Sequence, residues 1–325
     1  MAHADRMKIV ANDEEPLRKD ASQVKDGRIL YHYCGMDALM GIIKSKSLWL
    51  SDITKSNDSG ELRHTMKIAE ARTVQRLQEI CPPDLRSTFT GEVLQKILHS
   101  VLPAIEWRYY AICFSLVPDL LSQWRCYADD AAGCAIGFSE SALVTDAAES
   151  NFPDFQIIAN MYDVKYADTL CVDWLDTIGE CANLDEYSDR ILDIAEAYVF
   201  GSCSTKSLFF SEEREVRYLA RIESLVRPAV VVRPADPIPV RIETNNDSAF
   251  CGKELATLGV NARYSDGRIV GYLDFSFKEC PNQAVREIVL GPKCKASVED
   301  IRTLLAIEGF DPSSVVVQRS VGTYR

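Results

Sequence analysis

Helical and strand patterns are grouped along this chain rather than alternating. Two helical patterns follow one another between residues 61 and 103, broken at Pro82-Pro83, and a third at residues 184–198 steps by three and four. Apolar and aromatic strand patterns occupy most of the remaining sequence. A doubly wound parallel sheet would need helices that alternate with strands. The grouping therefore predicts an α+β fold.

The periodicity also predicts where the elements lie. Residues 1–27 form a flexible leader, and residues 28–325 form a single domain with a helical insertion near 61–103. A capping box at Ser297 and Asp300 marks the start of the last helix. The expected helices are 36–46, 62–80, 93–102, 120–128, 184–198 and 297–308. The expected strands are 29–33, 47–51, 107–116, 134–138, 155–166, 213–222, 230–232, 240–242, 269–277, 287–290 and 315–317.

The composition narrows the classes of protein that fit. No stretch approaches the ~18 uninterrupted apolar residues of a membrane span, and residues 1–26 lack the apolar run of a secretory signal. We therefore expect a cytoplasmic protein that does not use a membrane. The 11 cysteines form no CxxC pair and show no zinc-ligand spacing. We expect reduced thiols and no metal.

Charge and missing motifs exclude several activities. The formal net charge of −12 argues against a broad grip on nucleic acid, although it leaves room for a small basic cleft. The sequence lacks the glycine-rich, P-loop, HExxH and GxSxG motifs. A Rossmann dehydrogenase, an NTPase and a metalloprotease are each missing a required part.

Two carboxylates and an arginine stand at alternate positions near residue 215. On a strand, Glu213, Glu215 and Arg217 would share one face, with the carboxylates roughly 7 Å apart. Such a pair can hold one ligand, and like charge can raise the pKa of one member. The alternative is a solvated face of an edge strand, in which Arg217 balances the acids.

One histidine and several aromatic residues are the other candidates. His32 lies in the aromatic strand Leu30-Tyr31-His32-Tyr33; a histidine there is either a core residue or a ligand contact. Trp124 and Tyr127 follow the segment Cys113-Phe114-Ser115. They could stack on a nicotinamide or adenine ring, or belong to the core.

In order along the chain, these segments resemble a bacterial domain-of-unknown-function family related to the ADP-ribosyltransferase superfamily, and the opening resembles that of DarT-type toxins. The resemblance spans roughly residues 28–325. The segments that carry it are Leu30-Tyr31-His32-Tyr33, Leu48-Trp49-Leu50-Ser51, Asn57-Asp58 with Glu61, Cys113-Phe114-Ser115, Trp124 with Tyr127-Ala128, Gly133, Ile136-Gly137-Phe138, Lys206-Ser207, Glu213-x-Glu215-x-Arg217 and Glu287 to Lys293.

The resemblance implies two β-sheets that split around NAD⁺, which is a substrate here. It assigns His32 to a ribose hydroxyl, Glu215 to the catalytic carboxylate and Glu213 to the preceding carboxylate. Tyr127, with Trp124 behind it, would pack on nicotinamide. We expect Tyr33, Ser115 and Arg217 to contribute to the same site. Cys34 and Phe210 depart from the Thr and Trp common in this family.

The chemistry suits these residue types. The nicotinamide–ribose bond breaks through an oxocarbenium-like state, which a carboxylate stabilises. We expect an ADP-ribosyltransferase, a bacterial toxin or phage-defence effector, with a protein or nucleic-acid acceptor and an antitoxin or regulator as partner. The alternatives are an NAD glycohydrolase and a catalytically silent nucleotide-binding or interaction module. For an enzyme, His32 and Glu215 should face each other across one cleft that Tyr127 or Trp124 lines.

Overall fold

The computed structural model describes residues 27–55, 59–102, 108–143, 150–151, 155–167, 178–224, 229–232, 240–243, 258–265 and 267–324. Apart from Gly27, the predicted leader lies outside these residues. The predicted elements lie close to the ranges expected from periodicity, and the capping box of Ser297 and Asp300 is present. Short elements such as 140–143, 205–206 and 261–265 were not predicted.

The helices are α2 (Met36–Ser45), α3 (Ser59–Ile80), α4 (Gly91–Val101), α5 (Leu121–Tyr127), α6 (Glu140–Leu143), α7 (Leu184–Cys203), α9 (Pro281–Ala284) and α10 (Val298–Ile307), with 3-10 helices η2 (Ile53–Lys55) and η5 (Leu208–Glu213). The strands are β1 (Ile29–Cys34), β2 (Ser47–Asp52), β3 (Arg108–Ser115), β4 (Cys134–Ser139), β5 (Ser150–Asn151), β6 (Phe155–Asp163), β7 (Lys165–Tyr166), β8 (Thr205–Lys206), β9 (Glu215–Ser224), β10 (Ala229–Val232), β11 (Val240–Glu243), β12 (Asn261–Ser265), β13 (Arg268–Ser276), β14 (Val285–Leu290) and β15 (Val316–Arg319).

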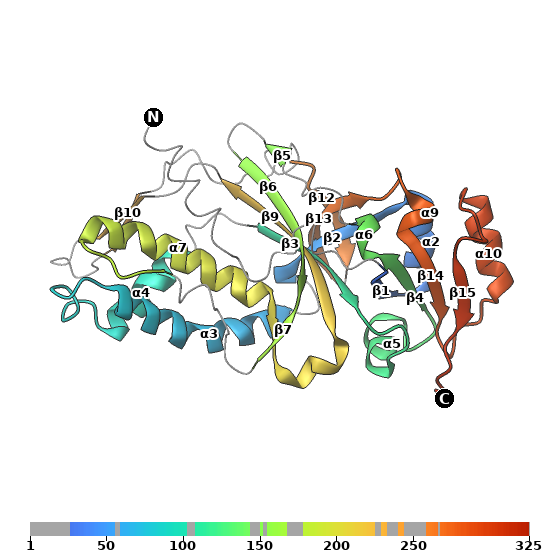
Figure 1. Ribbon diagram of the computed structural model, residues 1–325, viewed down its shortest axis with the longest axis horizontal. Coiled ribbons are helices and arrows are strands. Elements are labelled where there is room, and N and C mark those ends of the chain that lie inside the picture. Colours follow the sequence, from blue (N-terminus) through green and yellow to red (C-terminus); the bar gives the residue numbers. More distant parts are fainter. Residues whose placement is uncertain are drawn as a thin grey trace.

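The main sheet is mixed, and the expected α+β class is confirmed. Its longest path runs β12-β13-β2-β3-β1-β4-β14-β15, and β9, β6 and β5 extend from β3 in another direction. Within this sheet, β14 and β15 run parallel, whereas the other described pairs are antiparallel. Figure 1 shows β3, β6 and β9 near the middle of an elongated molecule.

Strand β3 is the branch point of this sheet. Strand β9 pairs with the whole length of β3, from Arg108 to Ser115, and occupies one edge of β3. Strand β2 pairs with β3 at Tyr110 and Ala111, and β1 pairs with it at Ser115. Since a strand has two edges, β1 and β2 must share the second one. The sheet therefore forks between Ala111 and Ser115.

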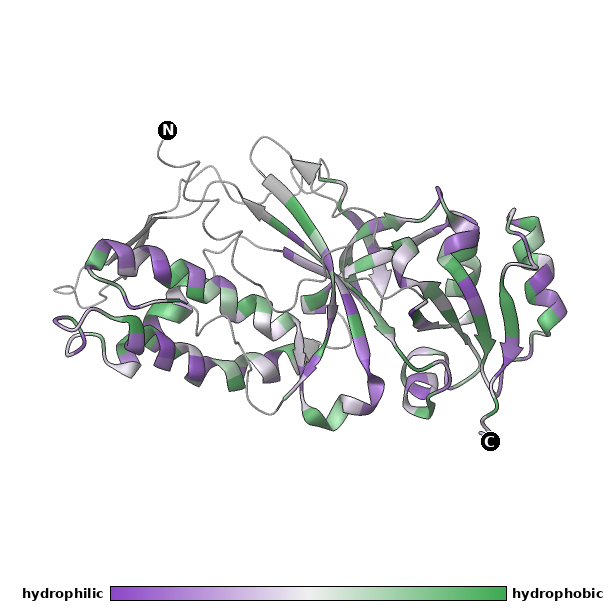
Figure 2. Ribbon diagram, viewed as in Figure 1, coloured by the Kyte–Doolittle hydropathy of each residue, from purple (hydrophilic) through white to green (hydrophobic). Residues whose placement is uncertain are grey.

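The helices fall into two groups. At one end of the molecule α3, α4 and α7 lie together, while α2, α9 and α10 lie at the other end (Figure 1). The first group has a hydrophobic core of its own, which includes Leu77, Leu94, Ile97, Tyr187 and Ile191. In Figure 2 α3 and α7 carry both hydrophobic and hydrophilic residues along their length, as expected of amphipathic helices. The predicted insertion at 61–103 thus joins a later helix to form one helical group.

The two faces of the sheet at β3 have different surroundings. Ile112 and Phe114 belong to the largest hydrophobic core, together with Val216 and Tyr218 of β9. On the opposite face, a smaller cluster joins Ala111 and Leu219 to residues of the last turns of α7. Side chains alternate between faces along a strand. Glu215 and Arg217 therefore lie on the face that α7 covers.

The start of β4 tolerates only glycine at position 133. A Cβ atom on Gly133 would lie 2.2 Å from the carbonyl oxygen of Cys34 in β1. The backbone N–H of Gly133 donates to the carbonyl of Ala128, and its carbonyl accepts from the N–H of Gly291. These bonds hold the turn against β1, so it has little freedom to move away.

We predict that Gly133→Ala lowers the free energy of unfolding by about 2 kcal/mol or more, because the new methyl group meets backbone that cannot yield. The matched control is Gly41→Ala inside α2, where a Cβ meets nothing within 4 Å. Since alanine favours helices over glycine, the control should gain up to ~1 kcal/mol. Urea denaturation of both variants measures the difference; equal stabilities would contradict the packing argument.

Candidate functional site

Four charged side chains are buried together at the start of β9. Lys206 is 1 % exposed, Arg217 3 %, Glu215 6 % and Glu213 8 %. Two cations thus meet two anions, as burial requires, because a buried charge without a partner is costly. The alternative of a solvated edge strand is wrong, since β9 lies between β3 and β6.

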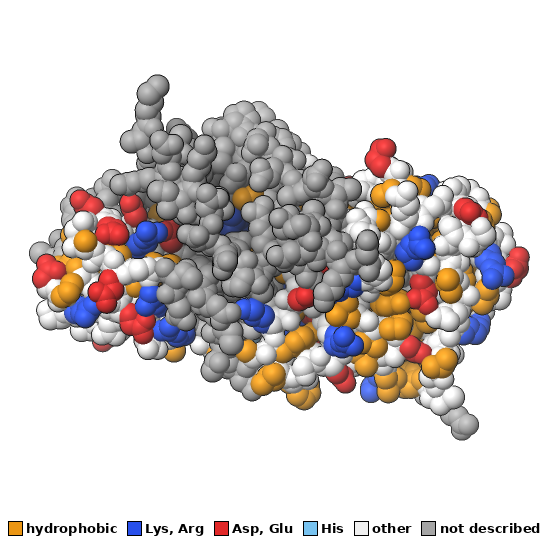
Figure 3. All heavy atoms as spheres, viewed as in Figure 1, with side chains coloured by type: hydrophobic (Ala, Val, Ile, Leu, Met, Phe, Trp, Pro, Cys, Tyr) orange, Lys and Arg blue, Asp and Glu red, His pale blue; other side chains and the backbone are white. Residues whose placement is uncertain are grey.

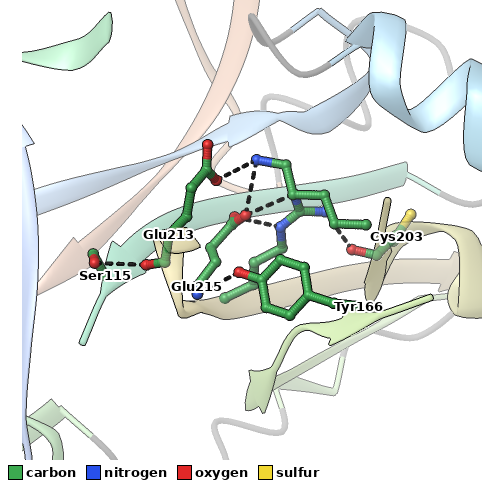
Figure 4. A network of polar contacts seen from close by, with 7 residues as sticks. Ser115, Tyr166, Cys203, Glu213 and Glu215 are labelled. Atoms are coloured by element: carbon green, nitrogen blue, oxygen red, sulfur yellow. Dashed lines mark hydrogen bonds and ion pairs between the residues drawn. The ribbon is translucent and has the colours of Figure 1, made fainter. Parts of the chain in front are cut away.

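Glu215 is held by donors from several elements. Arg217 Nε donates to Oε1 of Glu215 (2.6 Å) and Nη2 donates to Oε2 (3.2 Å). The ammonium group of Lys206 lies 3.2 Å from Oε2, and the thiol of Cys113 also hydrogen-bonds this carboxyl group. The backbone N–H of Glu215 donates to Tyr166 Oη (2.6 Å). Figure 4 shows the labelled Glu215 with Tyr166 beside it, and dashed lines mark the contacts of its carboxylate and of its backbone N–H.

Arg217 joins this network to the end of α7. Its Nη1 donates to the carbonyl oxygen of Cys203, the last residue of the helix, at 2.7 Å. The C-terminus of a helix carries partial negative charge and favours a cation. The guanidinium group is therefore committed to a carboxylate on one side and to a helix end on the other.

Glu213 reaches the network by a route that alternation does not predict. It ends η5 rather than lying on β9, and Arg214 between the two glutamates is left-handed (φ 44°). The prediction that Glu213 shares a strand face with Glu215 and Arg217 is therefore wrong for Glu213. Lys206 Nζ nevertheless binds Glu213 Oε2 at 2.6 Å and so joins the two carboxylates.

Ser115 fixes the position of η5 relative to β3. Its hydroxyl donates to the carbonyl oxygen of Glu213 (2.6 Å) and accepts from the N–H of Val117 (3.0 Å). The side chain is 2 % exposed. These contacts give Ser115 a role in holding the turn; its expected contact with NAD⁺ stays a prediction.

The electrostatic surroundings keep Glu215 ionised. Burial alone would raise the pKa of its carboxyl group, but Arg217 and Lys206, with the hydrogen bonds from Arg217 and Cys113, lower that pKa to about 2. Burial, together with nearby Glu215 and Glu213, raises the pKa of Tyr166 to about 12 despite the N–H that its hydroxyl accepts. Near neutral pH the site therefore holds a carboxylate beside a neutral phenol.

His32 occupies the fork of the sheet. Its Nδ1 lies 3.1 Å from the carbonyl oxygen of Cys113, and its ring packs edge-on against Phe114. Burial lowers the pKa of His32 below 6.5, and the bond to Cys113 offsets part of this effect. Because a carbonyl can only accept, Nδ1 carries the proton, and the neutral ring leaves Nε2 as an acceptor.

His32 and Glu215 contact the same residue, Cys113, from opposite faces of the sheet. Tyr31, Ser115 and Glu215 are partners across β1, β3 and β9 and so share one face. His32, one residue further, lies on the opposite face with Phe114. The expectation that the two side chains face each other across one cleft is therefore wrong: His32 contacts the carbonyl of Cys113, and Glu215 contacts its thiol.

The aromatic candidates lie in a separate cluster. Trp124 is 1 % exposed, packs edge-on against Tyr33 with centroids 4.7 Å apart, and donates from Nε1 to Asp119 (2.6 Å). Tyr33 in turn donates to the carbonyl of Val117. Trp124 is thus a core residue, and its expected place in the pocket is wrong. Tyr127 is half-buried against the same cluster, and its contact with nicotinamide stays a prediction.

Two residues of the network, Lys206 and Cys113, were absent from the predicted site. Both stand in segments that the sequence singles out, but neither has an expected charge or hydrogen-bond partner nearby in sequence. Only the pairing of β3 with β9 brings Cys113 opposite Arg217. No local signal identifies Lys206: it follows the amphipathic helix α7, and Leu208 and Phe209, which come after it, are exposed.

The structure reveals neither a metal cluster nor a membrane span in the parts of the chain that it describes. No group of three or more His, Cys, Asp or Glu side chains there could hold a metal ion. None of the described helices is long and apolar enough to cross a bilayer. On the side shown in Figure 3, acidic and basic side chains are interspersed over the helical end of the molecule.

The low pKa of Glu215 predicts a pH dependence of stability. The folded-state pKa, about 2, lies below the ordinary 4.5. The carboxylate therefore stabilises the fold above pH ~4.5, by roughly 3 kcal/mol, and this contribution is lost as the pH falls toward ~2. Urea denaturation across this window should show a shallower pH dependence for Glu215→Gln than for wild type. Glu92→Gln, on the surface of α4, should keep most of the wild-type slope; equal slopes for all three proteins would contradict the prediction.

Comparison with known proteins gives a partial match. A family model described as "Protein of unknown function (DUF2971)" matches residues 123–218. This span holds Lys206, Glu213, Glu215 and Arg217, but it excludes His32 and Cys113. No curated protein and no solved structure matches the chain. The chain thus contains a stretch similar to this family, and the description of that family carries no activity.

Proposed function

We propose that this protein cleaves the nicotinamide–ribose bond of NAD⁺ and transfers ADP-ribose to a macromolecular acceptor. The observation that carries the proposal is the buried, ionised carboxylate of Glu215, which contacts Cys113, the residue whose carbonyl group binds the neutral His32 at the fork of the sheet. The resemblance to the ADP-ribosyltransferase superfamily supports it. We extend the proposal to a toxin or phage-defence role in a bacterial cell on that resemblance alone.

The forked sheet suits a dinucleotide. In the superfamily NAD⁺ lies where two sheets split, and here β1 and β2 diverge from the same edge of β3. His32 and Glu215 reach opposite faces of β3. A ligand that contacts both must therefore lie at the fork, around Cys113. We therefore propose a binding site at the fork in place of the cleft between His32 and Glu215 that the sequence predicts.

Each proposed role uses a property of the described side chains. Glu215 stays negatively charged although it is buried, and a buried carboxylate stabilises a developing oxocarbenium ion strongly. The Nε2 atom of His32 accepts a hydrogen bond from a ribose hydroxyl. Glu213 orients or deprotonates the acceptor nucleophile. Tyr127 is the remaining aromatic candidate for packing on nicotinamide.

A catalytically silent module is the second candidate, and one observation favours it. A carboxylate offers about four lone-pair positions. Those of Glu215 receive Arg217 twice, Lys206 once and the Cys113 thiol once. A substrate hydroxyl must displace one of these donors before it can bind. If none is displaced, the four charges only hold the fold together.

Two glutamine variants distinguish the transferase from the silent module. We predict that Glu215→Gln lowers nicotinamide release and ADP-ribose transfer by on the order of 10²-fold, since it removes the charge that stabilises the transition state. Glu213→Gln should lower transfer while sparing most of the hydrolysis of NAD⁺. Both reactions are measured with labelled NAD⁺ and cell lysate, followed by protease or nuclease treatment to identify the acceptor.

The control for both variants is Glu299→Gln on the surface of α10, which should behave like wild type. Circular dichroism and thermal melts establish that each variant is folded. Full nicotinamide release by a folded Glu215→Gln variant contradicts the assignment of the carboxylate. Release by wild type with no labelled macromolecule would instead identify a glycohydrolase, in which water is the acceptor.

Binding can be tested without turnover. A ligand that binds only the folded state raises its stability by mass action. We predict that saturating NAD⁺ raises the Tm of wild type and that His32→Ala loses most of this rise, because the ribose loses its acceptor. Glu299→Gln should keep it. An unchanged wild-type Tm, together with no nicotinamide release, would favour the silent module.

A further inference from the structure

Lys206 contacts both carboxylates of the buried network. Its Nζ atom lies 2.6 Å from Oε2 of Glu213 and 3.2 Å from Oε2 of Glu215, and 4.9 Å from the ring centre of Phe210. Figure 4 labels Glu213 and Glu215, whose carboxylates lie near each other, and dashed lines mark their ion pairs. The lysine ends the short strand β8, which pairs with β7. A single point charge thus bridges η5 and β9.

The other groups around Glu215 have further partners of their own or are weak donors. Arg217 binds Glu215 and the carbonyl of Cys203. Tyr166 accepts the backbone N–H of Glu215, and Cys113 contributes only a weak thiol donor. Without Lys206, both carboxylates lose the ammonium group that lies within 3.2 Å of each. Like charges held close together cannot both stay ionised in a buried site.

We propose that Lys206 is the positioning residue of the reaction: it holds Glu213 and Glu215 side by side, so that the acceptor carboxylate and the ribose carboxylate act on one ligand. This inference rests on the proposed function. Lys206 itself touches no reacting atom; it acts through the two acids. Cleavage at the ribose therefore needs only Glu215. Transfer to the acceptor needs Glu213 and Glu215 held next to each other.

The test compares Lys206→Met with the double variant Lys206→Met/Glu213→Gln. In the single variant the ammonium group between the two carboxylates is gone, so one of them takes up a proton at higher pH. The acid limb of nicotinamide release should move up by roughly one pH unit or more, and kcat near that limb should fall on the order of tenfold. The KM for NAD⁺ should change little, because His32 is untouched.

The double variant removes the neighbouring carboxylate together with the lysine and leaves Glu215 paired with Arg217. Hydrolysis of NAD⁺ and its acid limb should therefore recover part of the way toward the wild-type values, while transfer to the macromolecule stays low because Glu213 is gone. Lys293→Met is the matched control: this lysine pairs with Asp130 at the surface, and its removal should leave the pH profile unchanged. The double variant keeps the test decisive if Lys206→Met alone does not fold.

The outcomes distinguish failure of the proposed function from failure of the role of Lys206. A wild-type protein that releases no nicotinamide overturns the proposed function and the role of Lys206 with it. An active wild type whose folded Lys206→Met variant keeps the wild-type pH profile overturns the role of Lys206 alone. So does a folded double variant that fails to recover hydrolysis. A purely structural lysine would change the Tm in these variants but not the acid limb.

Discussion

The pairing of Lys206 and Arg217 with Glu213 and Glu215 is the interaction on which the middle of this molecule depends. Burying four charges is unfavourable unless each finds partners, and here the partners come from different elements. Arg217 ties β9 to the end of α7, and Lys206 ties β8 to η5. Removing any one member would take a buried charge away from the partners that it contacts here. The network therefore fixes how the helical group sits on the sheet.

The same network limits how a ligand could reach the candidate site. Arg217, Lys206 and Cys113 surround the carboxylate of Glu215. The fork of the sheet lies between Glu215 and His32. Cys113 stands at the point where the two meet, with its carbonyl toward one and its thiol toward the other. Chemistry that uses both side chains has to take place around this residue.

Local patterns predicted most elements but not their assembly. The three-and-four spacing at residues 184–198 identified α7, and strand alternation correctly placed Glu215 and Arg217 on one face. Alternation failed at Glu213 because the backbone of Arg214 is left-handed, so that β9 begins only at Glu215. The prediction of a ligand role for Trp124 failed because aromatic content does not distinguish a ring in the core from one in a pocket. The fork itself depends on pairs between residues 31, 115 and 215 that no local rule connects.

The fork also decides what sets the angle between the two arms of the sheet. Where strands pair, backbone hydrogen bonds fix their spacing. Between Ala111 and Ser115 the second edge of β3 passes from β2 to β1, and these two strands do not pair with each other in the described part of the chain. Side-chain packing rather than a backbone ladder therefore connects the strands there, and the edge-on contact between Phe114 of β3 and His32 of β1 is part of it. A change in the angle between the two arms would break no backbone hydrogen bond between β1 and β2.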